Sequence, residues 1–194
     1  MKIEYLRLKN FRAFQNVELN DIPRLAVIVG ANGTGKSTLF QVFGFLRDAM
    51  RDNLHSALTR LGGSRGFKEV RSRDSDGDIE IEIKFRTSDD SPRISYELHI
   101  GIENDSPVVS REVLKYRRGS RGQPWHFLDF SRGTGTAVTN EVDKVEDEKN
   151  LVREQQTLKS KDILAIKGLP NSNAFLRWLR SENLSRTGTS QISI

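Results

Sequence analysis

The spacing of apolar and polar residues in the first part of the chain predicts strands at its start and two helices behind them. Charged and apolar side chains alternate over residues 2–9, and a second short strand is expected over residues 17–19. Residues 25–29 are five consecutive apolar residues, which is typical of a strand buried on both faces of a parallel sheet. Apolar residues between positions 39 and 50 then recur at helical spacing. A second helix is expected over residues 53–61, where a pair of glycines ends it.

The middle of the chain changes to the period of a strand. Apolar residues occupy every second position over residues 79–85 and again over residues 94–100, with a polar turn segment between them. This pattern predicts a half-buried antiparallel hairpin. Two more strands are expected over residues 108–116 and 125–130, each followed by a glycine-bearing turn. Residues 78–140 should therefore form an antiparallel β meander.

The last part of the chain carries weaker signals. Residues 162–169 form a short apolar element that Pro170 ends, and Asn173 is suited to cap one more helix. The final residues are polar. We therefore expect a single domain over residues 1–182, followed by a polar tail over residues 183–194.

Composition excludes several classes of protein. The chain has 194 residues, of which 36% are hydrophobic and 29% charged, which suits one globular domain with its own core. No apolar run approaches the ~20 residues of a membrane helix, and the charged N-terminus is not that of a signal peptide. There are no cysteines, so disulfides and thiolate metal sites are excluded. This composition fits a cytoplasmic protein that needs no membrane.

The balance of charge favours a polyanion as a partner. The net charge is +5 and the isoelectric point about 9.6. Two interpretations stay open for the basic residues: solvated loops and hairpin edges, or contact with DNA or RNA phosphates. Aromatic residues do not interleave with them as in a base-stacking platform. The basic residues gather in two groups: Arg60, Arg65, Lys68, Arg71 and Arg73, and then Lys115, Arg117, Arg118 and Arg121.

The segment "GANGTGKST" carries the clearest chemistry in the chain. Its residues match the phosphate-loop pattern G-x-x-x-x-G-K-[ST]. The glycines allow positive φ angles, so that backbone N–H groups can point inward around phosphates. Lys36 would reach the β- and γ-phosphates, Ser37 would coordinate Mg²⁺, and Thr38 would lie at the α-phosphate. The candidate nucleotide-binding residues of the loop are Gly30, Asn32, Gly33, Thr34, Gly35, Lys36, Ser37 and Thr38.

The context of the loop supports this interpretation over a glycine-rich turn without a ligand. An apolar run precedes the loop and an amphipathic helix follows it, which adds the positive end of a helix dipole. ATP is favoured over GTP because the chain has no N-K-x-D motif to recognise guanine. The D-x-x-G match at residues 74–77 is interpreted as a turn.

Two stretches, "YLRLKNFRAFQNVEL" and "AVIVGANGTGKSTLFQVFGFL", resemble the N-terminal lobe of SMC-like and RecF-like ABC-type ATPases. Within that group the sequence is similar to stand-alone ATPases related to the OLD family, which also carry an asparagine like Asn32 in the loop. The resemblance implies an α/β P-loop NTPase fold, with ATP and Mg as cofactors. It implies a role in DNA repair, DNA maintenance or phage defence. It also places Arg12 of the N-F-R-x-F element near the nucleotide.

The same resemblance shows which parts of such an ATPase are not found. The family's second lobe supplies an L-S-[GD]-G signature and a strand that ends in Asp-Glu. Asp129 has no glutamate after it, residues 183–188 only faintly echo the signature, and Gln155 and Gln156 come too early for the family's Q-loop. We therefore expect one lobe that binds ATP and Mg²⁺ better than it hydrolyses ATP, and that meets a second lobe or subunit in a head-to-tail dimer. The alternatives are a non-catalytic nucleic-acid-binding module and a P-loop kinase or GTPase.

Overall fold

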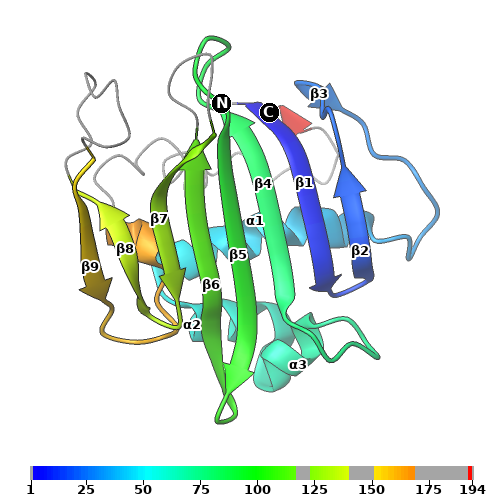
Figure 1. Ribbon diagram of the computed structural model, residues 1–194. Helices are drawn as coiled ribbons and strands as arrows, with labels where there is room; N and C mark the ends of the chain where they lie inside the picture. The colour runs from blue at the N-terminus through cyan, green and yellow to red at the C-terminus, as the bar shows by residue number, and fades with distance from the viewer. Residues whose placement is uncertain (1, 117–122, 140–150, 169–191, 194) are drawn as a thin grey trace.

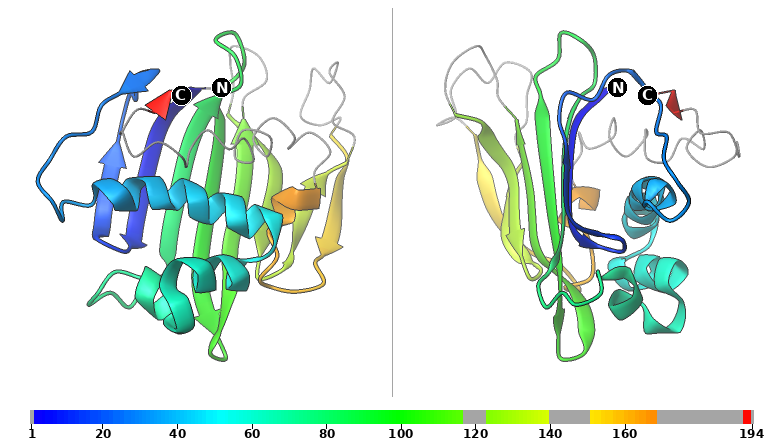
Figure 2. Two further views of the ribbon diagram at one scale, coloured as in Figure 1. Left: turned by 180° about the vertical axis from the view of Figure 1, so that it is seen from behind. Right: turned by 90° about the vertical axis from the view of Figure 1, so that its right-hand side faces the viewer.

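The computed structural model describes residues 2–116, 123–139, 151–168 and 192–193. They form one large sheet with helices packed on a single face, and the other face is open (Figures 1 and 2). Within this described part of the chain, no helix is long and apolar enough to cross a membrane. The predicted helix at Asn173, the echo of a signature at residues 183–188 and the basic residues 117, 118 and 121 lie outside the described residues.

The sheet has eight strands in the order β2-β1-β4-β5-β6-β7-β8-β9, and every neighbouring pair is antiparallel. The N-terminal strand β1 lies between β2 and β4, so it extends the meander by its own hairpin (Figure 1). The predicted meander is confirmed. The strands are β1 Lys2–Phe11, β2 Phe14–Leu19, β4 Ile79–Arg86, β5 Ile94–Glu103, β6 Ser106–Tyr116, β7 Trp125–Ser131, β8 Thr134–Val138 and β9 Arg153–Thr157.

The helices cover the sheet in the order that the sequence predicts. Helix α1, Lys36–Arg51, crosses the strands from the β2 edge toward β6 (Figure 2). Helix α2, Leu54–Gly62, begins where the side chain of Asn53 accepts a hydrogen bond from the N–H of Ser56, and Gly63 ends it. The shorter elements are the 3₁₀ helices η1, Gly63–Arg65, and η3, Ala165–Gly168, and the helix α3, Phe67–Val70.

The core lies between the helices and the sheet because apolar residues occupy every second position of the strands. In β4 the burial alternates strictly along the strand, and the apolar residues of α1 close over it. Each buried aliphatic side chain contributes about 1.5–3 kcal/mol. The open face of the sheet carries paired charges instead. There Glu80 lies 2.8 Å from the ammonium of Lys9 and 3.6 Å from the guanidinium of Arg7.

The prediction of a buried parallel strand over residues 25–29 is wrong. Only β3, Leu25–Ala26, is extended, and it pairs antiparallel with β10, Ile192–Ser193. The side chains of Leu25, Val27 and Val29 are 64%, 67% and 85% exposed. An unbroken apolar run suits two-sided burial, but burial needs flanking strands. No parallel neighbour for this segment exists among the described residues.

Strands β8, β9 and β10 were not expected from the sequence: β8 begins in a segment predicted as a glycine-bearing turn, and β10 falls in the predicted polar tail. Strand β9 is built from the residues Arg-Glu-Gln-Gln-Thr, all of them exposed, and it forms the edge of the sheet beside β8. Because an edge strand with no buried face has no alternation of apolar residues, its sequence does not predict a strand.

A buried carboxylate joins the sheet to η3. The side chain of Glu112 in β6 is fully buried and accepts hydrogen bonds from the N–H groups of Ala165, at 2.6 Å, and Ile166, at 3.1 Å. The hydroxyl of Tyr96 donates to the same carboxylate at 3.0 Å. Burial raises the pKa of Glu112 to about 7, and the three donors only partly oppose this shift.

This raised pKa predicts a stability that falls as the pH rises. Between pH 4.5 and about 7 the folded protein holds a proton on Glu112 that the unfolded chain has released. The contribution of this carboxyl group to the free energy of unfolding should therefore be lost across that window, by about 3 kcal/mol in total. In Glu112→Gln this loss should disappear. Urea unfolding at several pH values measures the difference between the two proteins, with Glu154→Gln on the exposed edge strand as the control. Parallel curves for wild type and Glu112→Gln would contradict the prediction.

Candidate nucleotide-binding site

The glycine loop stands at the start of α1, with its backbone arranged as an anion site requires. Gly33 has a φ of 87° and Gly35, the N-cap residue of α1, a φ of 92°, both in the left-handed region that favours glycine. No side chain caps this end of α1, and its first turn contains no acidic residue. The first backbone N–H groups and the positive end of the helix dipole are therefore available to an anion.

Side chains of the loop turn inward, toward its own carbonyl groups. The ammonium of Lys36 donates to the carbonyl oxygen of Gly30 at 2.7 Å and to that of Ala31 at 2.5 Å. The hydroxyl of Thr34 donates to the carbonyl of Ala31 at 2.9 Å. Lys36 thus already lies across the loop, where its donors could be transferred to phosphate oxygens.

The remaining loop residues differ in exposure. Asn32 lies exposed in the turn at the tip of the loop, and Ser37 is exposed in the first turn of α1. Thr38 is only 8% exposed, and it lines a cavity beside the loop. The hydroxyl of Ser37 is accessible to a metal ion from solution, as the pattern of the loop predicts.

Arg12 lies in the tight turn between β1 and β2 and faces α1. Its guanidinium donates to the side-chain oxygen of Gln41, one turn beyond Ser37, at 3.1 Å. Both Asn10 and Arg12 have positive φ angles, 56° and 50°, which cost non-glycine residues about 1–2 kcal/mol each. The surroundings compensate for this strain, since Arg12 donates its N–H to the carbonyl of Val70 at 2.7 Å.

The second aromatic residue of the N-F-R-x-F element touches the phosphate loop directly. A Cβ placed on Gly35 would lie 2.8 Å from two ring carbons of Phe14. Gly35 therefore has two independent reasons to be glycine, its positive φ and this contact. The sequence offered only the first of these reasons, because nothing in it shows that Phe14 packs against the loop.

A cavity of about 410 Å³ adjoins the first turn of α1 on the side of Arg12. Its size falls within the range of small-molecule sites. Three arginines line it, together with Thr38 and Ser72, whereas Glu69 and Asp74 are its two carboxylates. In the sequence, Arg71 and Arg73 stand out only as members of a basic group, and nothing there connects them with the loop. The arginines of the cavity are Arg12, Arg71 and Arg73.

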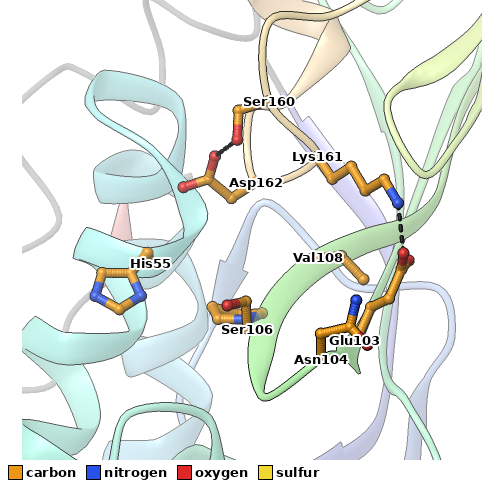
Figure 3. A pocket seen from close by; sticks show the side chains of 9 residues that line it. His55, Glu103, Asn104, Ser106, Val108, Ser160, Lys161 and Asp162 are labelled. Atoms are coloured by element: carbon orange, nitrogen blue, oxygen red, sulfur yellow. Dashed lines mark hydrogen bonds and ion pairs between the residues drawn. The ribbon is translucent and has the colours of Figure 1, made fainter.

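A second cavity, of about 520 Å³, lies between α2, the turn from β5 to β6 and residues 160–162 (Figure 3). Its charged groups are bound to one another: Lys161 pairs with Glu103, and the hydroxyl of Ser160 donates to Asp162 at 2.5 Å. None of its lining residues belongs to the glycine loop. Although it is larger, the lysine that lines it already pairs with a carboxylate.

Other residues that the sequence raised lie away from the loop. Asp129 lies on β7, a strand of the meander, 3.5 Å from the guanidinium of Arg111 and 3.4 Å from the imidazole of His126. Gln155 and Gln156 lie on β9, at the opposite edge of the sheet from β2, whose Phe14 contacts the loop. Neither glutamine is placed to serve as a Q-loop residue.

Comparison with known proteins identifies the family of the chain. The family model described as AAA ATPase domain matches residues 1–180. The chain belongs to the AAA ATPase domain family. Together with its relatives, the match supports the predicted resemblance to the N-terminal region of SMC-like and RecF-like ABC-type ATPases.

The relatives of this AAA ATPase domain are DNA repair proteins by name. The chain is 29% identical to the DNA replication and repair protein RecF of Paenarthrobacter aurescens, over 59% of its own length and 27% of that protein. It is 31% identical to the DNA double-strand break repair Rad50 ATPase of Saccharolobus solfataricus over 59% of the chain and 13% of that protein. RecF of Lactobacillus johnsonii is 26% identical over 69% of the chain and 37% of that protein. The chain thus matches only a minor part of the length of each relative.

Proposed function

We propose that this AAA ATPase domain binds ATP with Mg²⁺ as one lobe of a RecF- or Rad50-like ATPase. The observation that carries the proposal is the uncapped N-terminus of α1 with Lys36 lying across the glycine loop. Membership of the AAA ATPase domain family also supports ATP binding. A glycine-rich turn that binds no ligand gives no reason for the strained β1–β2 turn, which carries Arg12, to pack beside it.

Each residue of the loop binds a different part of the triphosphate. Lys36 neutralises the β- and γ-phosphates, and the N–H groups of the first turn of α1 bind their oxygens. Ser37 holds Mg²⁺, which would supply further neutralisation of phosphate charge, and Thr38 binds at the α-phosphate. The cavity with Arg12 and its two neighbouring arginines takes the remainder of the nucleotide.

The exposed apolar run before the loop supports the proposal of a partner lobe. Leu25, Val27 and Val29 leave the apolar run before the loop largely uncovered on one side. Exposed groups of apolar side chains often mark a surface that another protein segment covers. We propose that a second ATPase lobe or subunit covers this run and, in a head-to-tail dimer, supplies the carboxylate that activates water.

DNA binding is a second candidate function, and the names of the relatives favour it. The basic residues of α2 and η1 are partly neutralised, since Arg60 lies 2.5 Å from Asp52 and Arg65 lies 3.9 Å from Glu69. A nucleic-acid-binding module predicts DNA affinity that falls steeply with salt and persists without ATP. If DNA affinity instead depends on ATP, DNA binding is a property of the assembled ATPase.

A nucleotide titration and a turnover assay on the same protein test the proposed function. We expect ATP with Mg²⁺ to bind and GTP to bind more weakly, because no motif that recognises guanine is found in the sequence. We expect hydrolysis by the chain alone to stay at background. Tighter binding of GTP would favour the GTPase alternative. Turnover by the isolated chain that requires Lys36 would contradict the absence of a catalytic carboxylate.

A further inference from the structure

Ser72 is a buried hydroxyl residue that no phosphate-loop pattern includes. It is 4% exposed, and its hydroxyl lies 2.8 Å from the carbonyl oxygens of both Arg12 and Phe14. A serine hydroxyl has one proton to donate, so the two carbonyls share it. The backbone N–H of Ser72 donates to the carbonyl of Asn10 at 3.0 Å. One residue therefore binds the β1–β2 turn at three points.

The turn that Ser72 binds is the part of the molecule that touches the phosphate loop. Arg12 reaches Gln41 on α1, and the ring of Phe14 lies against Gly35. The turn is also strained, with positive φ angles at Asn10 and Arg12. A strained turn keeps its shape only where its surroundings fix it, and here the fixing groups belong to the segment that follows α3.

We propose that Ser72 is a positioning residue for the nucleotide site, one that sets where Arg12 and Phe14 stand relative to the glycine loop. The expected effect of Ser72 on the affinity for ATP rests on the proposed function. Ser72 also lines the cavity beside Thr38, so a nucleotide bound there lies against the segment that holds the turn. Loss of the hydroxyl frees two carbonyls and lets the turn leave the loop.

The test compares Ser72→Ala, Ser72→Thr and Ser131→Ala with wild type. Threonine keeps the hydroxyl that donates to the carbonyls of Arg12 and Phe14. Ser131 is the matched control, because its exposed hydroxyl donates to the carbonyl of Ser110 at 2.9 Å in a part of the sheet away from the loop. ATP with Mg²⁺ is the probe, at a temperature where circular dichroism shows every variant to be folded.

We expect Ser72→Ala to weaken ATP binding about tenfold, the effect of losing one well-placed hydrogen bond. Ser72→Thr and Ser131→Ala should stay within about twofold of wild type. In an Arg12→Ala background the further effect of Ser72→Ala should be smaller than in wild type, because the Arg12 side chain that Ser72 positions is then absent. Unchanged affinity in Ser72→Ala, or full additivity with Arg12→Ala, would overturn the inference.

A second measurement separates this inference from the proposed function. Hydrogen exchange followed by mass spectrometry reports the amides of residues 10–14 and 35–39 without any nucleotide. Both segments should exchange faster in Ser72→Ala and not in Ser131→Ala. If wild type fails to bind ATP, the proposed function is wrong, and the exchange result alone decides the role of Ser72. Unchanged exchange over residues 35–39 in Ser72→Ala overturns it.

Discussion

Lys36→Ala is expected to abolish measurable ATP binding while the protein stays folded. The ammonium is the only side-chain cation of the glycine loop, and it already lies over the loop at the carbonyl oxygens of Gly30 and Ala31. Charge-assisted hydrogen bonds to two phosphates contribute about 3 kcal/mol or more, which corresponds to a loss of at least about 100-fold in affinity. Isothermal titration calorimetry with ATP and Mg²⁺ measures it.

The fold should survive this change because Lys36 is not among the buried core residues. Its two hydrogen bonds lie in an exposed loop, so their loss should lower the free energy of unfolding by only about 1 kcal/mol. Lys159→Ala, on the exposed segment after β9, serves as the control for removal of a positive charge. An unchanged affinity for ATP in Lys36→Ala would refute the proposed nucleotide site.

Gly35→Ala is expected to damage both the loop and its affinity for ATP. An alanine at this position meets two costs: the left-handed backbone, at about 1–2 kcal/mol, and the ring of Phe14 at 2.8 Å from its Cβ. Overpacking of this kind typically adds about 1–3 kcal/mol. We expect the free energy of unfolding to fall by about 2–4 kcal/mol and ATP binding to be lost. Urea unfolding and calorimetry measure the two effects.

Gly33→Ala is the matched control for this variant. Gly33 has a similar φ of 87°, but no atom lies within 4 Å of a Cβ placed on it. It should therefore show only the cost of the backbone, about 1–2 kcal/mol. Phe14→Leu replaces the ring by a smaller side chain. Added to Gly35→Ala, it should restore part of the lost free energy of unfolding, and added to Gly33→Ala it should restore none. Equal losses in the two glycine variants would mean that the contact with Phe14 carries no energy.

Local patterns in the sequence were sufficient for most of the secondary structure. The period of two over residues 79–100 predicted the hairpin of β4 and β5, and Asn53 and Gly63 marked the two ends of α2. These features depend on neighbours in the chain, so the sequence contains the whole signal. The same holds for the glycine loop, whose pattern covers eight consecutive residues, 30–37.

Burial at the strand before the loop could not be predicted from its own residues. The apolar run of residues 25–29 indicates that the segment favours two covered faces, but covering depends on which strands lie beside it. In the structure its neighbour is β10, in antiparallel pairing, and Val27 and Val29 are exposed. The sequence of the run thus shows that it favours apolar contacts on both faces. It does not show whether neighbouring strands are present to make those contacts.

The sequence by itself determined that this protein carries a phosphate loop between an apolar run and an amphipathic helix. Only the tertiary structure decided what stands around that loop. The hydroxyl of Ser72 meets Arg12 and Phe14 across sequence separations of 60 and 58 residues. Arg71 and Arg73 line the same cavity as Thr38 only because the end of α3 packs under the β1–β2 turn. Contacts between distant segments depend on how the whole chain packs, and no short pattern in the sequence records that packing.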